Sequence, residues 1–222
     1  LLINTLTPSD LLQFYLSDSG ARIAVADAAF ADRFDATACR DTALDALIVV
    51  NGDLASAPAV PARSAAEWLS QPESLQAADT HRDDMAFWMY SSGSTGRPKG
   101  IVHLQHDMAY THWSYAHHLL DLNENDICFS VPKIFFAYGL GNSITFPFAA
   151  GAASGLMPGQ PKPAAIFDAI ARYRPTMFFG LPTLYTALTS APQAGTADLS
   201  SLRLSVSAAE VLSADVLNGW KA

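Results

Sequence analysis

The residues with the clearest chemical potential form one segment, residues 90–100, which reads Tyr-Ser-Ser-Gly-Ser-Thr-Gly-Arg-Pro-Lys-Gly. Its three glycines allow the backbone to approach a ligand closely and to turn N–H groups toward anionic oxygens. The serine and threonine hydroxyls add hydrogen-bond donors, and Lys99 adds a mobile positive charge. The segment therefore predicts a polyphosphate-binding loop. Its predicted phosphate-binding residues are Ser91, Ser92, Gly93, Ser94, Thr95, Gly96 and Lys99.

Two familiar nucleotide-binding patterns do not match this loop. The P-loop needs Ser or Thr directly after its Gly-Lys pair, whereas here Gly100 follows Lys99 and Pro98 precedes it. The dinucleotide pattern Gly-x-Gly-x-x-Gly is absent as well. A surface turn rich in serine and glycine is the alternative interpretation. The order of the residues and the apolar strand before them favour the phosphate loop.

Strand and helix patterns alternate regularly around this loop. We expect strands at 85–91, 127–131, 152–157, 176–179 and 202–206, helices at 105–120, 164–173 and 182–189, a partly helical stretch at 138–149, and a last helix capped by Ser213. Such alternation predicts an α/β fold, a parallel sheet with helices on both faces. We expect residues 85–212 to form one such sheet, with the loop leaving the carboxyl end of a strand, where ligands bind in open α/β sheets.

A helix-start pattern opens the first part of the chain. Thr7 is the expected N-cap, Pro8 the first helical residue and Asp10 the partner in a capping box, and Gly20 ends the helix. The elements expected after it are strands at 22–26 and 46–50, a loop at 51–64 rich in Pro and Ala, and a short helix capped by Ser64.

The polar stretch 71–84 separates this part from the rest. We therefore expect residues 1–80 to be a partial first α/β subdomain, and residues 81–222 to be a second α/β subdomain that is incomplete at its C-terminus. The sequence begins at Leu1 without a methionine and stops within an expected helix, so we interpret it as a piece of a longer protein.

The composition excludes several classes of protein. Half of the 222 residues are hydrophobic and 15% are charged, which is a globular composition rather than a disordered one. Acidic residues outnumber basic ones by 21 to 13, so a nucleic-acid partner is not expected. No apolar stretch approaches the roughly 20 residues of a membrane span. The two cysteines, Cys39 and Cys128, lie outside any metal-binding spacing. So few cysteines are typical of a reducing compartment, so we expect a cytoplasmic protein, and we expect no membrane partner.

Residues 90–100 closely resemble the phosphate-binding loop of the acyl-adenylate-forming, or AMP-binding, superfamily. That superfamily includes acyl-CoA and aryl-CoA ligases, luciferases and the adenylation domains of peptide synthetases. The resemblance implies ATP with Mg²⁺ and coenzyme A as cofactors or co-substrates, and a fold that is part of a large N-terminal domain. It also implies that Thr95 and Lys99 help to hold the β- and γ-phosphates.

Residues 132–142, Pro-Lys-Ile-Phe-Phe-Ala-Tyr-Gly-Leu-Gly-Asn, resemble the acid-pocket motif of benzoate-CoA ligases. The resemblance places Ala137, Tyr138 and Gly139 beside the aryl ring of the substrate. Aromatic side chains suit an apolar slot for such a ring. A core aromatic cluster is the alternative for Phe135, Phe136 and Tyr138.

Residues Ser207, Ala208, Ala209 and Glu210 resemble a Ser-Ala-Gly-Glu turn that borders the adenine and acyl sites in related ligases. Ala209 stands where that pattern has glycine. Its methyl group either narrows the pocket or forces a change of backbone if a positive φ is needed there. Glu210 is alternatively a solvated residue at a helix entrance.

The resemblance implies an aryl-CoA ligase that joins benzoate or a substituted benzoate to AMP and then to coenzyme A. Alternatives are an aryl-acid adenylation domain of a peptide synthetase and a nucleotide-binding module without ligase activity. The family's Tyr-Gly-x-Thr/Ser-Glu segment, ribose-binding Asp and catalytic lysine are not within these residues, so no complete catalytic set and no activity of the isolated chain are expected. The expected partner is a small aromatic carboxylic acid, and the sequence does not decide which one. The parent protein could also form a homo-oligomer.

Five of the six histidines lie between residues 103 and 118. A zinc site on a helix favours pairs at i and i+4, whereas His112 and His117 are five apart. No dedicated metal site is therefore expected, and a partly exposed aromatic helix is the alternative. His103 follows the loop closely and is a candidate to approach nucleotide phosphates.

Overall fold

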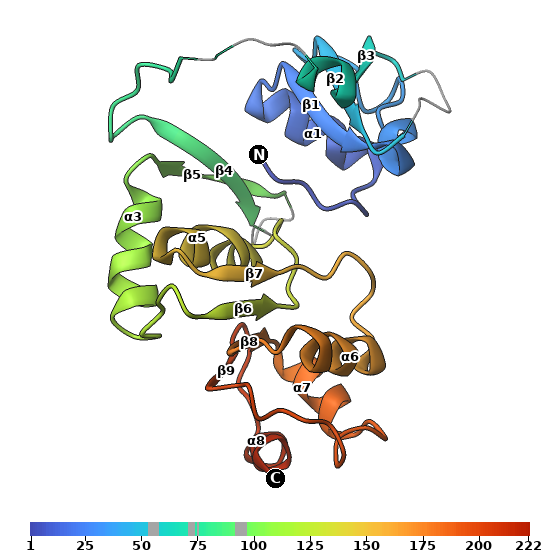
Figure 1. Ribbon diagram of the computed structural model, residues 1–222. Coiled ribbons are helices and arrows are strands. Elements are labelled where there is room, and N and C mark those ends of the chain that lie inside the picture. Colours follow the sequence, from blue (N-terminus) through green and yellow to red (C-terminus); the bar gives the residue numbers. More distant parts are fainter. Residues whose placement is uncertain (53–57, 71–73, 75, 92–96) are drawn as a thin grey trace. The chain divides into compact units, whose positions relative to one another are not determined.

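The computed structural model describes residues 1–222 apart from 53–57, 71–73, 75 and 92–96 (Figure 1). The described residues form two compact units, one built from 1–80 and 97–100 and the other from 81–91 and 101–222. Each unit has its own sheet and hydrophobic core. Within the described ranges, no helix has the length and apolar character needed to cross a bilayer.

The first unit contains a three-stranded parallel sheet in the order β1-β2-β3. Its elements are α1 (Ser9–Ser19), β1 (Ile23–Asp27), the 3-10 helix η1 (Ala28–Arg33), β2 (Ala46–Val50), β3 (Ala62–Ser64) and α2 (Ala65–Leu69). Leu12 and Leu16, four residues apart on α1, pack with Leu47 and Val49 of β2. The prediction of a loop over residues 51–64 is therefore wrong at its end, because Ala62–Ser64 forms β3, which pairs with β2.

The ends of the two helices in this unit test the predicted caps. Thr7 is not the cap of α1: Pro8 is the N-cap, and no side chain caps the helix. The Thr7 N–H instead donates to the Asn4 carbonyl at 3.0 Å, in a turn that buries the threonine. Gly20 ends α1 with a φ of 61°, as predicted. Ser64 caps α2 as predicted, because its Oγ accepts from the Ala66 N–H.

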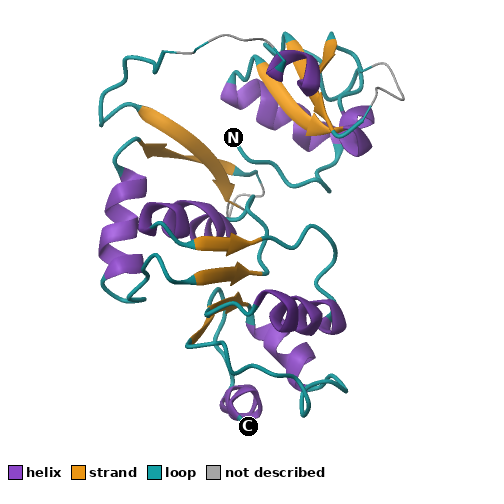
Figure 2. Ribbon diagram, in the orientation of Figure 1, coloured by secondary structure: helices purple, strands orange, loops and turns teal. Residues whose placement is uncertain are grey.

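The second unit is built on a four-stranded parallel sheet in the order β7-β6-β8-β9 (Figure 2). Its strands are β6 (Ile127–Ser130), β7 (Ala153–Gly155), β8 (Met177–Gly180) and β9 (Leu204–Ser207). Its helices are α3 (Asp107–Thr111), α4 (Ala137–Leu140), α5 (Phe146–Ala150), α6 (Pro163–Tyr173), α7 (Pro182–Thr189) and α8 (Ala214–Lys221), with π-helical segments η2 (His112–His117) and η3 (Gly141–Thr145). Ser213 caps α8 as predicted, accepting from the Val216 N–H.

Side chains of the central strands alternate between the two faces of this sheet. Phe129 and Phe178 belong to a core with residues of α6 and α7, whereas Cys128 and Phe179 belong to a core with residues of η2 and α5. Because successive side chains of a strand point to opposite faces, two cores require covering helices on both sides. The predicted α/β class, with helices on both faces of a parallel sheet, is confirmed.

The strand before the phosphate loop does not join this sheet. β4 (Met85–Ser91) pairs with β5 (Lys99–Leu104) in a separate two-stranded sheet. The prediction of one sheet over residues 85–212 is wrong on this point. The apolar run after the loop, Ile101 and Val102, forms a partner strand instead of leading straight into a helix. The exposed Met85 shows that β4 is not buried on both faces.

A buried ion pair fastens the amino-terminal ends of β6, β8 and β9. Asp126 is 3% exposed, and its carboxylate accepts from Arg203 at 2.6 Å and from the Thr176 hydroxyl at 2.6 Å. Arg203 also donates to the carbonyls of Leu120 and Asp121. Burial alone raises the pKa of Asp126, but the hydrogen bonds from Arg203, Thr176 and the Asn123 N–H lower it below its usual value.

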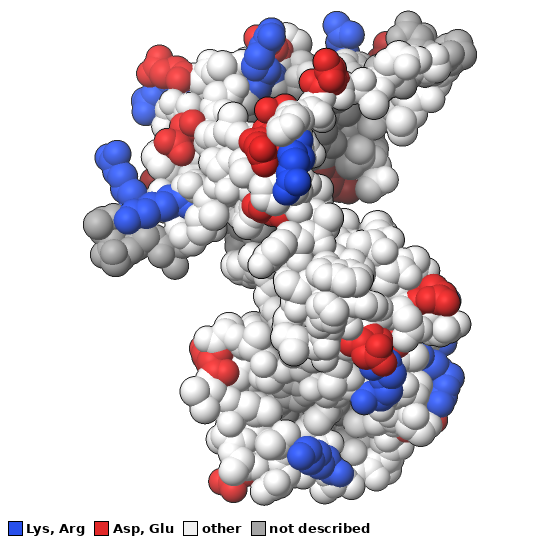
Figure 3. All heavy atoms as spheres, turned by 90° about the vertical axis from the view of Figure 1, so that its left-hand side faces the viewer, with Lys and Arg blue, Asp and Glu red and all other residues white. Residues whose placement is uncertain are grey.

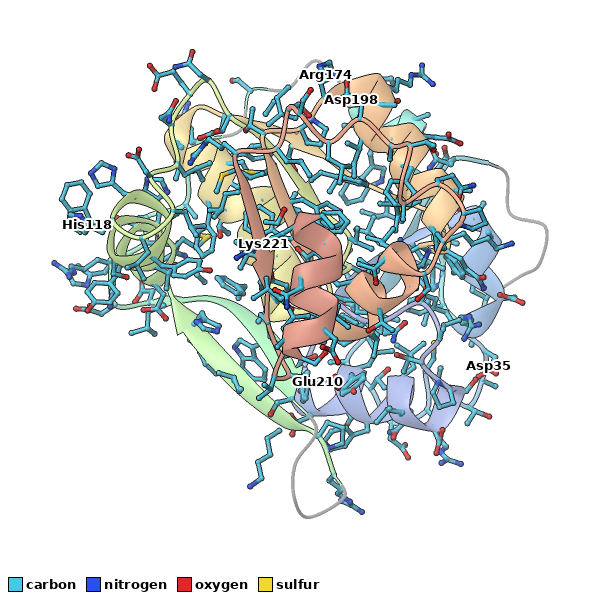
Figure 4. All side chains as sticks on the ribbon, turned by 90° about the horizontal axis from the view of Figure 1, so that it is seen from below. Asp35, His118, Arg174, Asp198, Glu210 and Lys221 are labelled. Carbon is cyan, nitrogen blue, oxygen red and sulfur yellow. The ribbon has the colours of Figure 1, made fainter. Side chains whose placement is uncertain are left out.

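Charged side chains are scattered over the surface. In the view of Figure 3, Lys and Arg lie among acidic residues and form no continuous basic face. One exposed pair, Arg174 with Asp198, joins the end of α6 to the segment before β9 at 2.8 Å (Figure 4). This distribution agrees with the overall charge of −8.

Candidate functional site

The two ends of the predicted phosphate loop lie on strands. Ser91 is the last residue of β4 and Lys99 is the first residue of β5, and both are exposed. The loop therefore leaves the carboxyl end of β4, as predicted. The other predicted phosphate contacts, Ser92, Gly93, Ser94, Thr95 and Gly96, lie outside the described residues.

The predicted acid-pocket residues form the first turn of α4, which begins at Ala137 after an extended Phe136. Ala137 is exposed, whereas Gly139 is buried. The amide of the buried Asn142 donates to the Tyr138 carbonyl at 2.8 Å, which ties this turn to the next one. A short helical turn with its own side-chain support is a fixed platform for a binding site.

Gly139 is required by close packing and not by its backbone angles. A Cβ atom at Gly139 would lie 2.1 Å from the Lys133 carbonyl oxygen and 2.5 Å from the Pro132 carbonyl oxygen. The Lys133 ammonium donates to the carbonyls of Met157 and Gly159, the latter at 2.7 Å. Burial lowers the pKa of Lys133. The lysine thus holds the segment before α4 against the loop after β7.

Ala137 lines a cavity of about 140 Å³ in the second unit. The walls come from β4, β5, α3, α4, η3 and α5, and are mostly apolar. They are Phe87, Met89, His103, Asp107, Met108, Thr111, Ala137, Leu140, Gly141, Thr145 and Phe146. Two larger hollows, of about 400 and 300 Å³, include none of the predicted site residues. Of these three cavities, each lined by described residues, the one at Ala137 contains a residue of the predicted acid-pocket motif.

Tyr138 does not line this cavity. Its ring packs edge-on to Phe179, with 6.4 Å between ring centroids, and its hydroxyl donates to the Val206 carbonyl at 3.1 Å. The Tyr185 hydroxyl donates to the same carbonyl at 3.0 Å. Burial, with the neighbouring Tyr185 and Tyr115, raises the pKa of Tyr138, which keeps the phenol a neutral donor. The two tyrosines fix the carboxyl end of β9.

The turn that follows β9 carries the third group of predicted residues. Ser207 is the last residue of the strand, and its buried hydroxyl has no hydrogen-bond partner among the described residues. Ala208 is half-buried, and Glu210 is exposed near the start of α8 (Figure 4). Ala209 has a φ of 75°, in the left-handed region that favours glycine. Ala209 therefore adopts a backbone conformation that glycine takes up more readily than alanine.

Replacing Ala209 with glycine is expected to stabilise the protein. A left-handed alanine costs about 1–2 kcal/mol, of which the greater flexibility of glycine in the unfolded chain cancels about 0.5–1 kcal/mol. The net gain in the free energy of unfolding should be about 0.5 kcal/mol, measured by urea unfolding of the parent. Ala208→Gly is the matched control and should destabilise, because Ala208 is not at positive φ. If both variants lose the same free energy of unfolding, the backbone at Ala209 is not strained.

The histidines of the helix after β5 are spread around it. Trp113 stacks on His117 at 4.5 Å on the exposed side, and His118 points outward (Figure 4). Tyr110 is also exposed, so this is the partly exposed aromatic helix named as the alternative. Over the described ranges, no group of three or more His, Cys, Asp or Glu is placed to hold a metal ion.

His103 and Asp107 form a pair that the motifs did not indicate. The Nδ1 atom of His103 lies 3.2 Å from Oδ2 of Asp107, and both residues line the cavity. From the sequence, His103 was a candidate only for contact with phosphates. The signal that was missed is the His-x-x-x-Asp spacing, which here places a carboxylate beside the imidazole.

The chain was compared with known proteins. The sequence model of the AMP-binding enzyme family matches residues 1–222. The chain is 40% identical to the benzoate–CoA ligase of Thauera aromatica over 220 residues, which are 99% of the chain and 41% of that protein. It is 38% identical to the 4-hydroxybenzoate–CoA/benzoate–CoA ligase of Rhodopseudomonas palustris, with 99% and 40% covered. It thus spans about two fifths of the length of these relatives.

A solved structure supports the same relationship. The anthranilate CoA ligase AuaEII, in complex with anthranoyl-AMP, superposes with a TM-score of 0.90 and 34% sequence identity. The match covers 99% of the chain and 42% of that protein. The strands and helices described above thus belong to part of a larger known fold.

Proposed function

Since the chain belongs to the AMP-binding enzyme family, we propose that its parent protein is an ATP-dependent aryl-CoA ligase. In the first step, a carboxylate oxygen of an aromatic acid attacks the α-phosphorus of ATP, and pyrophosphate leaves. In the second step, the sulfur of coenzyme A attacks the acyl carbon, and AMP leaves. The activity is proposed for the parent, because the chain spans 41% of the Thauera relative.

The observation that carries this proposal is the apolar cavity at Ala137. Its volume of about 140 Å³ is close to the roughly 150 Å³ of an engineered apolar cavity that binds benzene. Phe87 and Phe146 supply aromatic walls. A single aromatic ring fits this space by size and polarity. The names of the relatives, which are ligases of benzoate and hydroxybenzoate, support an aromatic acid as the substrate.

The neighbouring predicted residues have complementary roles in this proposal. Tyr138 supports the wall behind Ala137, since its ring and hydroxyl are fixed against the sheet. The Ser207 hydroxyl, which lacks a partner in the part of the chain that the structure describes, and the turn through Glu210 border the adenine and acyl groups. Lys99 and the hydroxyls of the phosphate loop bind the phosphates of ATP, and we expect Mg²⁺ to arrive with those phosphates. The chain's contribution is to position two substrates and stabilise charge.

Filling the cavity should separate acid binding from ATP binding. Ala137→Leu in the full-length parent is expected to raise the KM for benzoate roughly tenfold or more, because the larger side chain occupies space meant for the ring. The KM for ATP should change little. Both constants are measured by acid-dependent exchange of pyrophosphate into ATP.

Lys99→Ala is the contrasting variant in the same assay. It should raise the KM for ATP or lower the rate of adenylate formation, and leave the order of preference among acids unchanged. If Ala137→Leu leaves the KM for every aryl acid unchanged, the cavity is not the acid site. If Lys99→Ala changes neither the KM for ATP nor the rate of adenylate formation, Lys99 does not bind the phosphates.

A further inference from the structure

The cavity at Ala137 is mostly apolar, but one part of its wall carries two ionisable side chains. His103 comes from β5 and Asp107 from the start of α3, and both line the cavity. The Oδ2 atom of Asp107 faces Nδ1 of His103 at 3.2 Å and accepts from the Leu104 N–H at 3.0 Å. Its Oδ1 atom lies 3.3 Å from Nε2 of His106. The carboxylate is therefore held from three sides and fixes the imidazole of His103.

The ring plane of His103 is fixed as well. Phe87 stacks on the imidazole with 4.7 Å between ring centroids and 16° between planes. The side chains of His103 and Asp107 are 33% and 30% exposed, so solvent reaches the pair only in part. An imidazole held by a carboxylate and an aromatic ring presents its other nitrogen in a defined direction.

The second ring nitrogen of His103 has no partner among the described residues. A neutral imidazole whose Nδ1–H is donated to a carboxylate offers Nε2 as an acceptor. His103 is partly exposed, so water reaches its ring, and a donor on a ligand that replaces this water beside the apolar walls forms a directed hydrogen bond to Nε2. A hydroxyl or amino group on an aromatic ring is such a donor.

We propose that His103, positioned by Asp107 and Phe87, selects aromatic acids that carry a hydroxyl or amino substituent on the ring. The inference rests on the proposed function and adds a substrate class to it. His103 is a specificity-determining residue in this account. In this proposal it contacts the acid, and its expected approach to nucleotide phosphates stays a separate prediction.

The test compares seven acids in the full-length parent by acid-dependent pyrophosphate exchange. They are benzoate, the three hydroxybenzoates and the three aminobenzoates. At least one substituted acid should exceed benzoate about tenfold in kcat/KM. His103→Phe keeps the stacked ring but removes the acceptor, so this preference should fall to within about twofold, with benzoate itself retained. His103→Gln, which still carries an acceptor, should keep part of the preference.

His118→Phe is the matched control. His118 is exposed on the helix after β5 and neither lines the cavity nor contacts Asp107, so its loss should leave the preference within about twofold of the original. Each preference is a ratio of two acids on one protein, so a partly unfolded variant does not distort it. The inference is overturned if His103→Phe leaves the preference unchanged, or if the parent favours benzoate over all six substituted acids. In either case the ligase proposal still stands. Exchange with none of the seven acids refutes the ligase proposal itself.

Discussion

Gly139→Ala is expected to destabilise the parent by about 3 kcal/mol or more and to abolish activation of the acid. The added Cβ would lie 2.1 Å from the Lys133 carbonyl oxygen, and backbone atoms cannot move aside without displacing the turn. The Lys133 ammonium holds that turn to the Met157 and Gly159 carbonyls. Ala137 lies on the same turn of helix, so its displacement also disturbs the cavity.

The measurement for Gly139→Ala is urea unfolding, together with pyrophosphate exchange at saturating benzoate. Gly195→Ala is the matched control, because a Cβ there meets no atom within 4 Å. The control should change stability by less than about 1 kcal/mol. If Gly139→Ala is as stable as the control, the Lys133 carbonyl lies farther from Gly139 than it does in the structure.

Arg203→Met is expected to lower the free energy of unfolding by about 3 kcal/mol at pH 7. Removing the guanidinium leaves the Asp126 carboxylate buried, with only Thr176 and the Asn123 N–H as donors. Arg203 is itself 38% exposed on its side chain, so the larger penalty comes from the 3%-exposed Asp126. The exposed pair of Arg174 and Asp198 provides the control, and Arg174→Met should cost under about 1 kcal/mol.

The loss of stability in Arg203→Met should depend on pH in a defined direction. The pKa of Asp126 is lowered in the folded protein, so the pair stabilises above the unfolded-state pKa, about 3.9, and its contribution is lost as pH falls through the folded pKa. Without Arg203, the hydrogen bond that most opposes the effect of burial is gone, so the pKa of Asp126 is higher than in the unaltered protein, and the protonated carboxyl is tolerated. The deficit of Arg203→Met should therefore shrink as pH falls below about 4. A deficit that is constant over this range would mean that the pair is not the cause.

The fold was predictable from the sequence where local pattern and tertiary packing agree. The strands at 46–50 and 127–131 and the helix at 164–173 appear nearly as expected, because their apolar spacing matches the faces that they bury. The pairing of β4 with β5 was not predictable in this way. An apolar run gives no information on its partner strand, and the loop between these strands was taken to lead into a helix.

The candidate site was predictable to the level of motifs but not of contacts. The segment 132–142 indicated an acid pocket, and the structure places Ala137 on a cavity but points Tyr138 at the Val206 carbonyl. Whether a side chain at a helix start faces a cavity or the sheet depends on packing that spacing does not encode. The same holds for His103, whose partners come from elements that the loop resemblance does not cover.

Pyrophosphate exchange shows whether the parent activates an aromatic acid. The full-length protein is incubated with ATP, Mg²⁺ and labelled pyrophosphate, with benzoate, a hydroxybenzoate, acetate or no acid. The account predicts label in ATP with an aryl acid, and little or none with acetate or without acid, because an apolar cavity of about 140 Å³ favours a ring. Exchange that is equal with acetate and the aryl acids, or that is absent with both aryl acids, would contradict it.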